Sequence, residues 1–361
     1  MSDIKMIMVG DTNVGRPNPD SAFESVKHLI QDADIAFCNL ETVLADAKYL
    51  SPYDRVTLPR TDEAVLDAYL KAGFNVMNQA NNPNTYHGLD ALVRAVEVLE
   101  EANVIHAGAG RNLEEARKPA IIEKDGTKVA FVCRTSVGTP DMGATIDTPG
   151  VAFHPIYTSY EPTTRVHSNP GWWPIVHTTP DRGEYLTQLE EDIKKAREIA
   201  DIVIMSWHWG LSPFQLYPGA SAGDVEVMEY QKELAHFVVD CGVDLVIGHH
   251  SHEPQPIEVY KGKAIFYSLA NFVHDLENFS DMQFNAIFAK CLIRDGKISQ
   301  LSFIPGTIDG NGPPVFGKPS ELPEVVNRMQ EMSSPFGTCL LYTSDAADDS
   351  LRVDLGGRRI I

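Results

Sequence analysis

Short apolar runs and amphipathic stretches alternate along most of the chain, and this alternation restricts the possible folds more than any other feature. The apolar runs are rich in β-branched and aromatic residues and predict strands at 4–10, 34–39, 74–78, 103–108, 119–124, 128–134, 201–207, 243–248, 256–260, 264–269, 284–293 and 297–305. The amphipathic stretches have a helical spacing of apolar residues and predict helices at 21–31, 62–72, 89–102, 183–200, 225–241 and 321–332. The strand–helix–strand order implies parallel strands joined by helical crossovers.

Three strand pairs are separated by only a short polar turn, at 119–134, 256–269 and 284–305, and they predict antiparallel hairpins. Crossovers combined with hairpins predict mixed sheets that stack face to face with helices outside them. The expected fold class is therefore α/β. The length of 361 residues suggests two domains, but a single large α/β domain over residues 1–338 also fits and is the expected organisation. Hydrophobic residues make up 43% of the chain, which is enough for a core of adequate size.

Two segments depart from the alternation. Residues 139–182 hold clustered prolines and glycines, and a loop of this length is uncommon within a compact domain. Two interpretations stay open for it, a lid-like loop inserted in the domain and an ordinary surface excursion. Residues 339–361 show neither a helical nor a strand period, and they are expected to be a non-native tail, so they are left out of the fold prediction.

The overall charge and the cysteines limit the function classes. The formal net charge of −20 argues against a nucleic-acid binder and against adhesion to an anionic membrane. An anionic substrate stays compatible, because a bound divalent metal reverses the local potential. The five cysteines are scattered without a CxxC pair and predict free thiols in a reducing compartment. With no signal peptide or membrane span recognised, a cytoplasmic location is expected.

Polar side chains of types that bind metal follow five separate predicted strands, at the point where each strand ends. In open α/β sheets the carboxyl ends of the strands are where sites form, so five such placements together predict a common site. The residues concerned are Asp11, Asn39, Glu41, Asn81, Asn82, His208, His249, His250 and His252.

The ligand types in this set are imidazole, carboxylate and amide oxygen, without thiolate, and they suit one or two divalent ions of Zn, Mn or Fe. His250 and His252 are two residues apart on a loop after a buried strand, so both rings can point at one centre. Glu41 is a candidate bridging carboxylate. For His208, between two tryptophans, metal ligation and contact with the transition state both stay open, beside a role in an aromatic core.

Further residues are assigned supporting roles. Arg16 is expected to orient an anionic substrate group by bidentate contact. Asn39 is expected to orient the ligands, and Asn271 either supports the histidine loop from outside the centre or is a turn asparagine. Five other histidines lack a second ligand nearby in the sequence and are assigned to lid or surface positions: His154, His167, His177, His236 and His274.

The order of these motifs resembles the CapA family, which is associated with poly-γ-glutamate capsule synthesis and belongs to the calcineurin-like metallophosphoesterase superfamily. The resemblance runs from about residue 4 to 275 through GDTNVGR, NLE, ANN, GAGRNLEEARKP, SWHWG, VIGHHSHEPQPIE and YSLANF. It implies a four-layer α/β/β/α sandwich. It also implies a metal site lined by Asp11, Glu41, Asn82, His208, His250 and His252, with His249 outside the ligand set.

One motif departs from the family pattern. Where the family usually reads ANNHxxDxG, this chain reads ANNPNTYHG, with Pro83 in place of the histidine and Tyr86 in place of the aspartate. The family histidine helps to protonate the leaving group or to stabilise the transition state, so its loss puts general-acid catalysis in question. His87 is the candidate that enters the site instead, which gives His208, Arg16 and His87 as candidate catalytic residues.

Two functions from different classes follow. The first is a metal-dependent hydrolase that acts on a phosphoester, or on an amide such as a γ-glutamyl bond, of a small anionic or polyglutamate-like substrate. The second is a non-catalytic component of capsule or polymer assembly that retains a degenerate metal site and binds other assembly proteins. Pro83 and Tyr86 favour the second.

Overall fold

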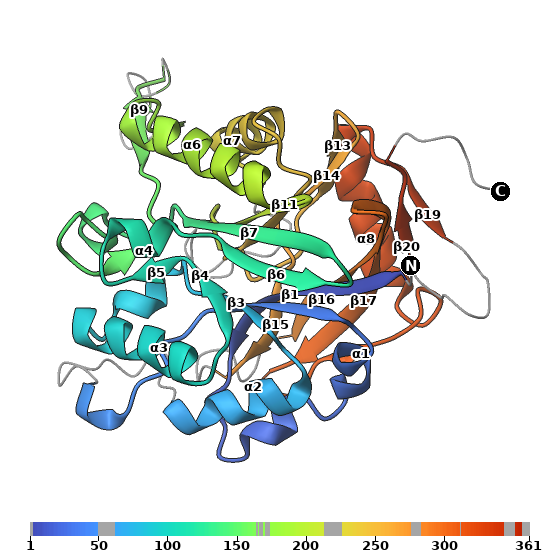
Figure 1. The fold of residues 1–361 in the computed structure, drawn as a ribbon. Helices are drawn as coiled ribbons and strands as arrows, with labels where there is room; N and C mark the ends of the chain where they lie inside the picture. Colours follow the sequence, from blue (N-terminus) through green and yellow to red (C-terminus); the bar gives the residue numbers. More distant parts are fainter. Residues whose placement is uncertain are drawn as a thin grey trace.

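Two mixed β-sheets stack face to face and helices cover their outer faces in the computed structural model of the protein (Figure 1). This is the four-layer α/β/β/α sandwich that the family resemblance implies. The structure describes residues 3–49, 62–163, 165, 169, 174–212, 226–275, 283–310, 312–342 and 351–355.

The first sheet has the strand order β19-β20-β17-β16-β1-β2-β3-β4, and β15 and β18 pair with β1 and β17. Its strands are β1 (Ile4–Asn13), β2 (Ile35–Leu40), β3 (Val76–Asn78), β4 (Ile105–Ala107), β15 (Asn271–His274), β16 (Gln283–Arg294), β17 (Lys297–Asp309), β18 (Val315–Phe316), β19 (Leu340–Tyr342) and β20 (Leu351–Val353). Strands β1 to β4 and β15 pair in parallel, whereas β16 and β17 form the expected antiparallel hairpin.

The second sheet has the order β13-β14-β12-β11-β7-β6. Its strands are β6 (Ala120–Lys124), β7 (Thr127–Thr135), β11 (Ile202–His208), β12 (Leu245–His249), β13 (Ile257–Tyr260) and β14 (Lys263–Phe266). The pairs β6–β7 and β13–β14 are the other two predicted hairpins, and β7, β11, β12 and β14 run parallel. The carboxyl ends of the parallel strands of this sheet therefore lie at one edge.

Helices α1 (Lys27–Gln31), α2 (Leu66–Ala72) and α3 (Leu89–Glu101) lie outside the first sheet, and α6 (Glu184–Ile199) and α7 (Glu229–Asp240) lie outside the second (Figure 1). Helix α8 (Pro323–Ser333) packs against β13 and β17. The shorter helices are η1 (Pro19–Ala22), η2 (Ala47–Tyr49), η3 (Glu63–Val65), η4 (Asn82–Thr85), α4 (Leu113–Arg117), η5 (Pro140–Met142) and η9 (Ser334–Phe336). Of the predicted helix 21–31 only the last part is α-helical. Among the described residues, none of the helices has the length and apolar character that crossing a membrane requires.

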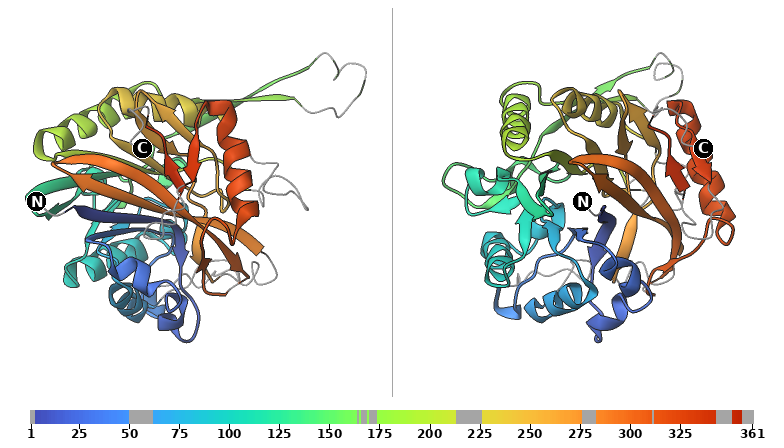
Figure 2. Two further views of the ribbon diagram at one scale, coloured as in Figure 1. Left: turned by 90° about the vertical axis from the view of Figure 1, so that its right-hand side faces the viewer. Right: turned by 45° about the vertical axis from the view of Figure 1, so that its right-hand side comes forward.

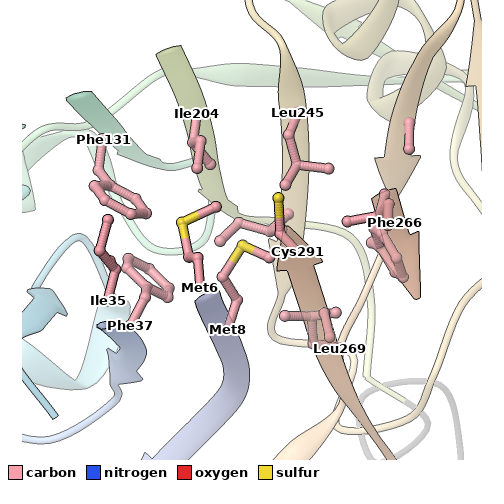
Figure 3. Packing of buried hydrophobic residues seen from close by; sticks show 14 of the residues in the cluster. Met6, Met8, Ile35, Phe37, Phe131, Ile204, Leu245, Phe266, Leu269 and Cys291 are labelled. Atoms are coloured by element: carbon pink, nitrogen blue, oxygen red, sulfur yellow. The ribbon is translucent and has the colours of Figure 1, made fainter. Parts of the chain in front are cut away.

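The core between the two sheets is built by alternate residues of the strands (Figure 3). Met6 and Met8 of β1 face the second sheet, whereas Ile7 between them faces the outer helices. Phe37 of the first sheet stacks on Phe131 of the second, with ring centroids 5.1 Å apart. Because both faces of the central strands are buried, these strands read in the sequence as continuous apolar runs.

The segment 139–182 is more regular than the predicted loop. It contains β8 (Gly150–Val151), which pairs with β5 (Ala109–Gly110), and an antiparallel ribbon of β9 (Ile156–Glu161) and β10 (Ile175–Pro180). The ribbon projects from the body of the molecule (Figure 2). Its function as a lid stays a prediction.

The end of the chain and the cysteines can also be compared with expectation. Residues 340–342 and 351–353 pair as β19 and β20 and extend the first sheet, although the sequence there shows no strand period. All five cysteines are free, as predicted, and Cys38, Cys133 and Cys291 are buried.

Candidate metal centre

The ends of parallel strands from both sheets place the predicted site residues next to one another. In the first sheet Asp11 of β1 pairs with Asn39 of β2 and with Asn271 of β15. In the second sheet His208 of β11 pairs with His249 of β12. Because the sheets stack, these two strand edges meet at a single buried centre.

Two glycines allow the strand ends to come this close. A Cβ atom at Gly10 would lie 1.8 Å from the backbone oxygen of Ala270, and one at Gly248 would lie 1.9 Å from the backbone oxygen of Tyr267. No side chain fits at either position. Gly10 therefore allows β15 to lie close to β1, and Gly248 allows the segment that follows β14 to lie close to β12.

The histidine loop after β12 has an unusual backbone. His250 and His252 have φ angles of 86° and 57°, in the left-handed region that residues with a Cβ seldom adopt. Each such residue costs about 1–3 kcal/mol and persists only where the surroundings enforce it. Ala270, on the facing turn, has a φ of 66°. Strain concentrated on these two turns is typical of a functional site.

The described residues form two groups of acidic and imidazole side chains, and within each group the ligand atoms lie within 4.8 Å of one another. The first group is Glu41, His252 and His274, and the second is Glu41, His208 and His250. All five side chains are buried. Glu41 belongs to both groups, so the two groups are adjacent.

The two carboxylate oxygens of Glu41 face different groups. Oε1 lies 3.5 Å from Nε2 of His208, and Oε2 lies 3.3 Å from Nε2 of His274 and 4.0 Å from Nδ1 of His252. Oδ1 of Asn82 lies 2.8 Å from the same Nε2 of His208. Asn82 therefore adds an amide oxygen to the second group, and Glu41 lies between the two groups; its role as a bridging carboxylate stays a prediction.

Asp11 lies beside the first group. Its Oδ2 is 3.6 Å from Nδ1 of His252, and its Oδ1 is 3.6 Å from Nδ1 of His249. The side-chain amide of Asn39 donates to Oδ1 at 2.6 Å, and the backbone N–H of His250 donates to Oδ2 at 2.9 Å. These two hydrogen bonds fix the direction in which the carboxylate points.

Further amides hold the surrounding side chains in place. Asn78, at the end of β3, donates to Oδ1 of Asn39 at 2.6 Å. Oδ1 of Asn271 lies 2.8 Å from Nδ1 of His252, and Nε2 of His249 lies 3.1 Å from a serine hydroxyl of β11. Asn39 and Asn271 contact ligand candidates and His249 lies beside Asp11, and the supporting role of the three residues stays a prediction. Asn78 was not identified, although it is the last residue of a predicted strand.

The electrostatics of the centre are unfavourable without a cation. Burial raises the pKa of Asp11 well above its usual range, and the charge of Glu41 raises it further. Burial also raises the pKa of Glu41 to about 7, against the lowering effect of His252. Burial is the main cause that lowers the pKa of five imidazoles, which are those of His208, His249, His250, His252 and His274. The pKa falls to about 3 for His250 and for His274. The imidazoles are therefore neutral at pH 7 and do not balance the carboxylates.

These residues fit a divalent cation. Neutral imidazole and ionised carboxylate are the protonation states that bind metal, and a cation between them would stabilise the buried charges of Asp11 and Glu41. The donors are imidazole, carboxylate and amide without thiolate, which suits Zn, Mn or Fe. The first group with Asp11 and the second group with Asn82 would each provide a set of ligands.

Arg16 forms a bidentate ion pair with Asp275. Its Nε donates to Oδ2 at 2.8 Å and its Nη2 donates to Oδ1 at 2.6 Å. The backbone N–H groups of Gly15 and Arg16 also donate to Oδ2, each at 3.0 Å. Asp275 directly follows His274, so this ion pair fastens the loop after β1 to the end of β15. The role of Arg16 in orienting a substrate stays a prediction.

His87 lies between η4 and α3 and is buried. It belongs to neither of the two groups that the described residues form. Its entry into the centre in place of a family histidine also stays a prediction.

The assignment of His274 to a lid or surface position is wrong. Its side chain is buried at the end of β15 and faces Glu41. The same assignment is wrong for His154, which is buried against Trp207. His177 and His236 are partly exposed, as expected, and His167 lies outside the described residues. The sequence signal that could have placed His274 was the short run Asn-Phe-Val-His, which directly follows YSLA. This run forms β15, a strand that was not predicted.

The chain is similar to several known proteins. The family model described as "Bacterial capsule synthesis protein PGA_cap" matches residues 5–276. The capsule biosynthesis protein CapA of Bacillus anthracis is 26% identical over 99% of this chain and 79% of its own length. The PGA biosynthesis protein CapA of Bacillus subtilis is 28% identical over 74% of this chain and 62% of its own length.

Two further similarities extend the comparison. A probable polyglutamine synthesis accessory protein of Mycobacterium tuberculosis is 29% identical over 68% of this chain and 56% of its own length. The solved structure of a novel phosphatase from Mycoplasma pneumoniae aligns with a TM-score of 0.47 and 15% identity, over 87% of this chain and 96% of that one. The family match extends over most of the chain and confirms the resemblance seen in its motifs: the chain belongs to the bacterial capsule synthesis protein family, PGA_cap.

Proposed function

We propose that the chain is a metal-dependent hydrolase that acts on a phosphoester, or on an amide such as a γ-glutamyl bond, of a small anionic or polyglutamate-like substrate. The observation that carries this proposal is the position of Glu41 between two ligand groups, with one carboxylate oxygen towards each. A carboxylate shared in this way is typical of sites in which two ions act on one substrate.

The side chains of the centre have different roles in this proposal. A divalent cation, when bound, would polarise the scissile group and lower the pKa of a coordinated water. Glu41 and the imidazoles of both groups would hold and orient the ions, and the burial of these side chains limits the access of bulk water. Asp11, held by Asn39 and by a backbone N–H, keeps one fixed orientation throughout. His208 either ligates an ion or stabilises negative charge on the reacting group.

The substrate class follows from the chemistry of the centre together with the relatives. The cations would attract an anionic substrate to a protein whose net charge is −20. The names of two relatives link them to capsule and PGA biosynthesis, which favours a polyglutamate-related substrate and other capsule-assembly proteins as partners.

A non-catalytic role in polymer assembly is the second candidate, and Pro83 favours it. This residue stands where the family pattern has a histidine that acts on the leaving group, and proline has no proton to donate. In this case the centre would bind metal for structure or for a partner.

The experiment that separates the two candidates is metal analysis combined with a turnover screen. The purified chain is loaded with Mn²⁺ or Zn²⁺ and assayed with phosphomonoesters, phosphodiesters and γ-glutamyl amides. The hydrolase proposal predicts bound metal and turnover that is abolished in His250→Ala. Because His236 is partly exposed and stacks on Tyr260, His236→Ala is the matched control and should retain activity.

Bound metal without turnover across the whole panel would reject the hydrolase and support the assembly role. Absence of bound metal in the wild-type chain would reject both.

A further inference from the structure

We propose that the hydroxyl of Tyr86 donates a hydrogen bond to a tetrahedral oxyanion, such as a phosphoryl group or phosphate, bound at the metal centre. This inference rests on the proposed hydrolase function and names a further catalytic residue for it. The contact is non-covalent, and the proton stays on the phenol.

The position of Tyr86 at the rim of the centre is the first argument. Its side chain is 42% exposed, whereas the ligand candidates Glu41, His208 and Asn82 are buried. It directly follows η4, the short helix that begins with Asn82. A substrate that reaches the centre from solvent on this side therefore passes the phenol ring.

A chain of contacts connects the phenol to the centre. The side-chain amide of Asn82 donates through Nδ2 to the hydroxyl oxygen of Tyr86. The Oδ1 of the same amide lies 2.8 Å from Nε2 of His208, which lies 3.5 Å from Oε1 of Glu41. The hydroxyl is thus one amide group away from the second ligand group.

The direction of this hydrogen bond decides what the hydroxyl can still do. Because the amide is the donor, the hydroxyl oxygen accepts, and the hydrogen of the phenol remains available for another acceptor. A phenol has an ordinary pKa of roughly 10 and keeps that hydrogen at neutral pH. An oxygen of a bound oxyanion is the acceptor that the chemistry of the centre would supply.

The neighbouring residues of η4 do not offer an equivalent donor. Pro83 has no N–H and no polar side chain. The amide of Asn84 donates to a backbone carbonyl at 2.7 Å, and the hydroxyl of Thr85 donates to the backbone carbonyl of Asn82 at 3.1 Å. Unlike these three neighbours, Tyr86 is exposed and has a hydroxyl hydrogen that its contact with Asn82 leaves available for a substrate.

The test compares Tyr86→Phe with the wild-type protein, both loaded with Mn²⁺. Three quantities are measured: Mn²⁺ content, the Kd of inorganic phosphate by calorimetry, and kcat/KM with p-nitrophenyl phosphate. The expected result is an unchanged Mn²⁺ content and a Kd that is weaker by about 10- to 100-fold, the effect of removing a hydrogen bond to a charged group. For a substrate that turns over, kcat/KM should fall by a similar factor.

Tyr260→Phe is the matched control, because it also removes one tyrosine hydroxyl. That hydroxyl donates to Asp240 at 3.3 Å, and Tyr260 pairs with Lys263 at the start of β14, at the opposite end of the parallel strands from the centre. The control should leave the Kd of phosphate unchanged.

Three results would overturn the inference. The first is that the Mn²⁺-loaded wild type binds no phosphate, and the second is that wild type and Tyr86→Phe have equal Kd values for phosphate. The third is that Tyr86→Phe loses its Mn²⁺, which would show that the hydroxyl only holds Asn82. The proposed function fails separately, if the wild type binds Mn²⁺ and phosphate but hydrolyses no ester or amide. In that case the Kd comparison still decides the role of Tyr86 in binding.

Discussion

Nε2 of His274 lies 3.3 Å from Oε2 of Glu41, although the two residues are 233 positions apart in the chain. This contact completes the first ligand group, since the other oxygen of Glu41 already faces His208. The carboxylate of Glu41 therefore connects a histidine on a strand of the first sheet with a histidine on a strand of the second.

Replacing Glu41 by glutamine tests this connection. Because Glu41 belongs to both groups, Glu41→Gln should lose most of the bound metal from both, measured as ions per chain by mass spectrometry after dialysis. A variant that retains the wild-type metal content would show that Glu41 is not shared between ions.

The same substitution should stabilise the metal-free protein at high pH. Folding raises the pKa of Glu41 from 4.5 to about 7, so this carboxyl favours the folded state below about pH 4.5, and that contribution is lost as the pH rises through 7. At pH 8 the imidazoles are neutral in both states, and metal-free Glu41→Gln should melt about 2–5 °C above wild type. A lower melting temperature, measured by calorimetry in chelator, would contradict a raised pKa.

The variant His274→Ala should lose the metal ion of the first group and keep the metal ion of the second group. His208, His250 and Asn82 remain around Oε1 of Glu41 in this variant. Metal content should therefore fall from about two ions per chain to about one, because the first group loses one of its imidazole ligands and binds its ion more weakly. His236→Ala is the control and should keep the wild-type content. Equal content in wild type and His274→Ala would place His274 outside the ligand set.

Gly248→Ala should destabilise the fold, because the added methyl group would meet the backbone oxygen of Tyr267 at 1.9 Å. Overpacking against a rigid backbone costs about 3 kcal/mol of unfolding free energy. Gly183→Ala is the control, since its nearest neighbour would be a carboxylate oxygen at 3.4 Å, and it should change stability by less than about 1 kcal/mol. Urea denaturation of both variants measures the difference, and similar midpoints would contradict the close approach.

A buried ion-pair cluster away from the centre makes a separate prediction. Asp192 accepts from Arg117 at 2.8 and 2.9 Å and also from Arg134, whose side chain is 4% exposed. Asp192→Asn would leave two arginines without their counter-charge and should cost about 3–5 kcal/mol of unfolding free energy. Asp32→Asn breaks an exposed pair with Lys5 and should cost no more than about 1 kcal/mol. Equal losses in the two variants would contradict the burial of this cluster.

Most of the fold could be predicted because each strand and helix carries its own local signal. β1, β7, β11 and α3 lie within a few residues of their predicted bounds. The predicted helix 21–31 was too long, since Pro19–Ala22 forms a 3-10 helix and the α-helix begins at Lys27. The ribbon of β9 and β10 was missed because its strands pair only with each other and alternate weakly between apolar and polar residues.

Site residues could be predicted where a polar residue directly follows a predicted apolar strand, as Asp11, His208 and His249 do. His274 could not, because it lies on β15, a strand of four residues that pairs in parallel with β1. The run Asn-Phe-Val-His is a local signal of only four residues, too short to indicate that it pairs with β1 more than 250 residues earlier in the chain. The contact between Tyr86 and Asn82 likewise depends on the turn that η4 makes, which the sequence did not predict.

The central claim is that one carboxylate, that of Glu41, joins two metal sites, and anomalous X-ray diffraction from crystals soaked in Mn²⁺ tests it most directly. The account predicts two anomalous peaks, one between Glu41 and the pair His252 and His274, and the other between Glu41 and the pair His208 and His250. A map with no peak beside Glu41, or with Mn²⁺ bound only elsewhere on the protein, would contradict it.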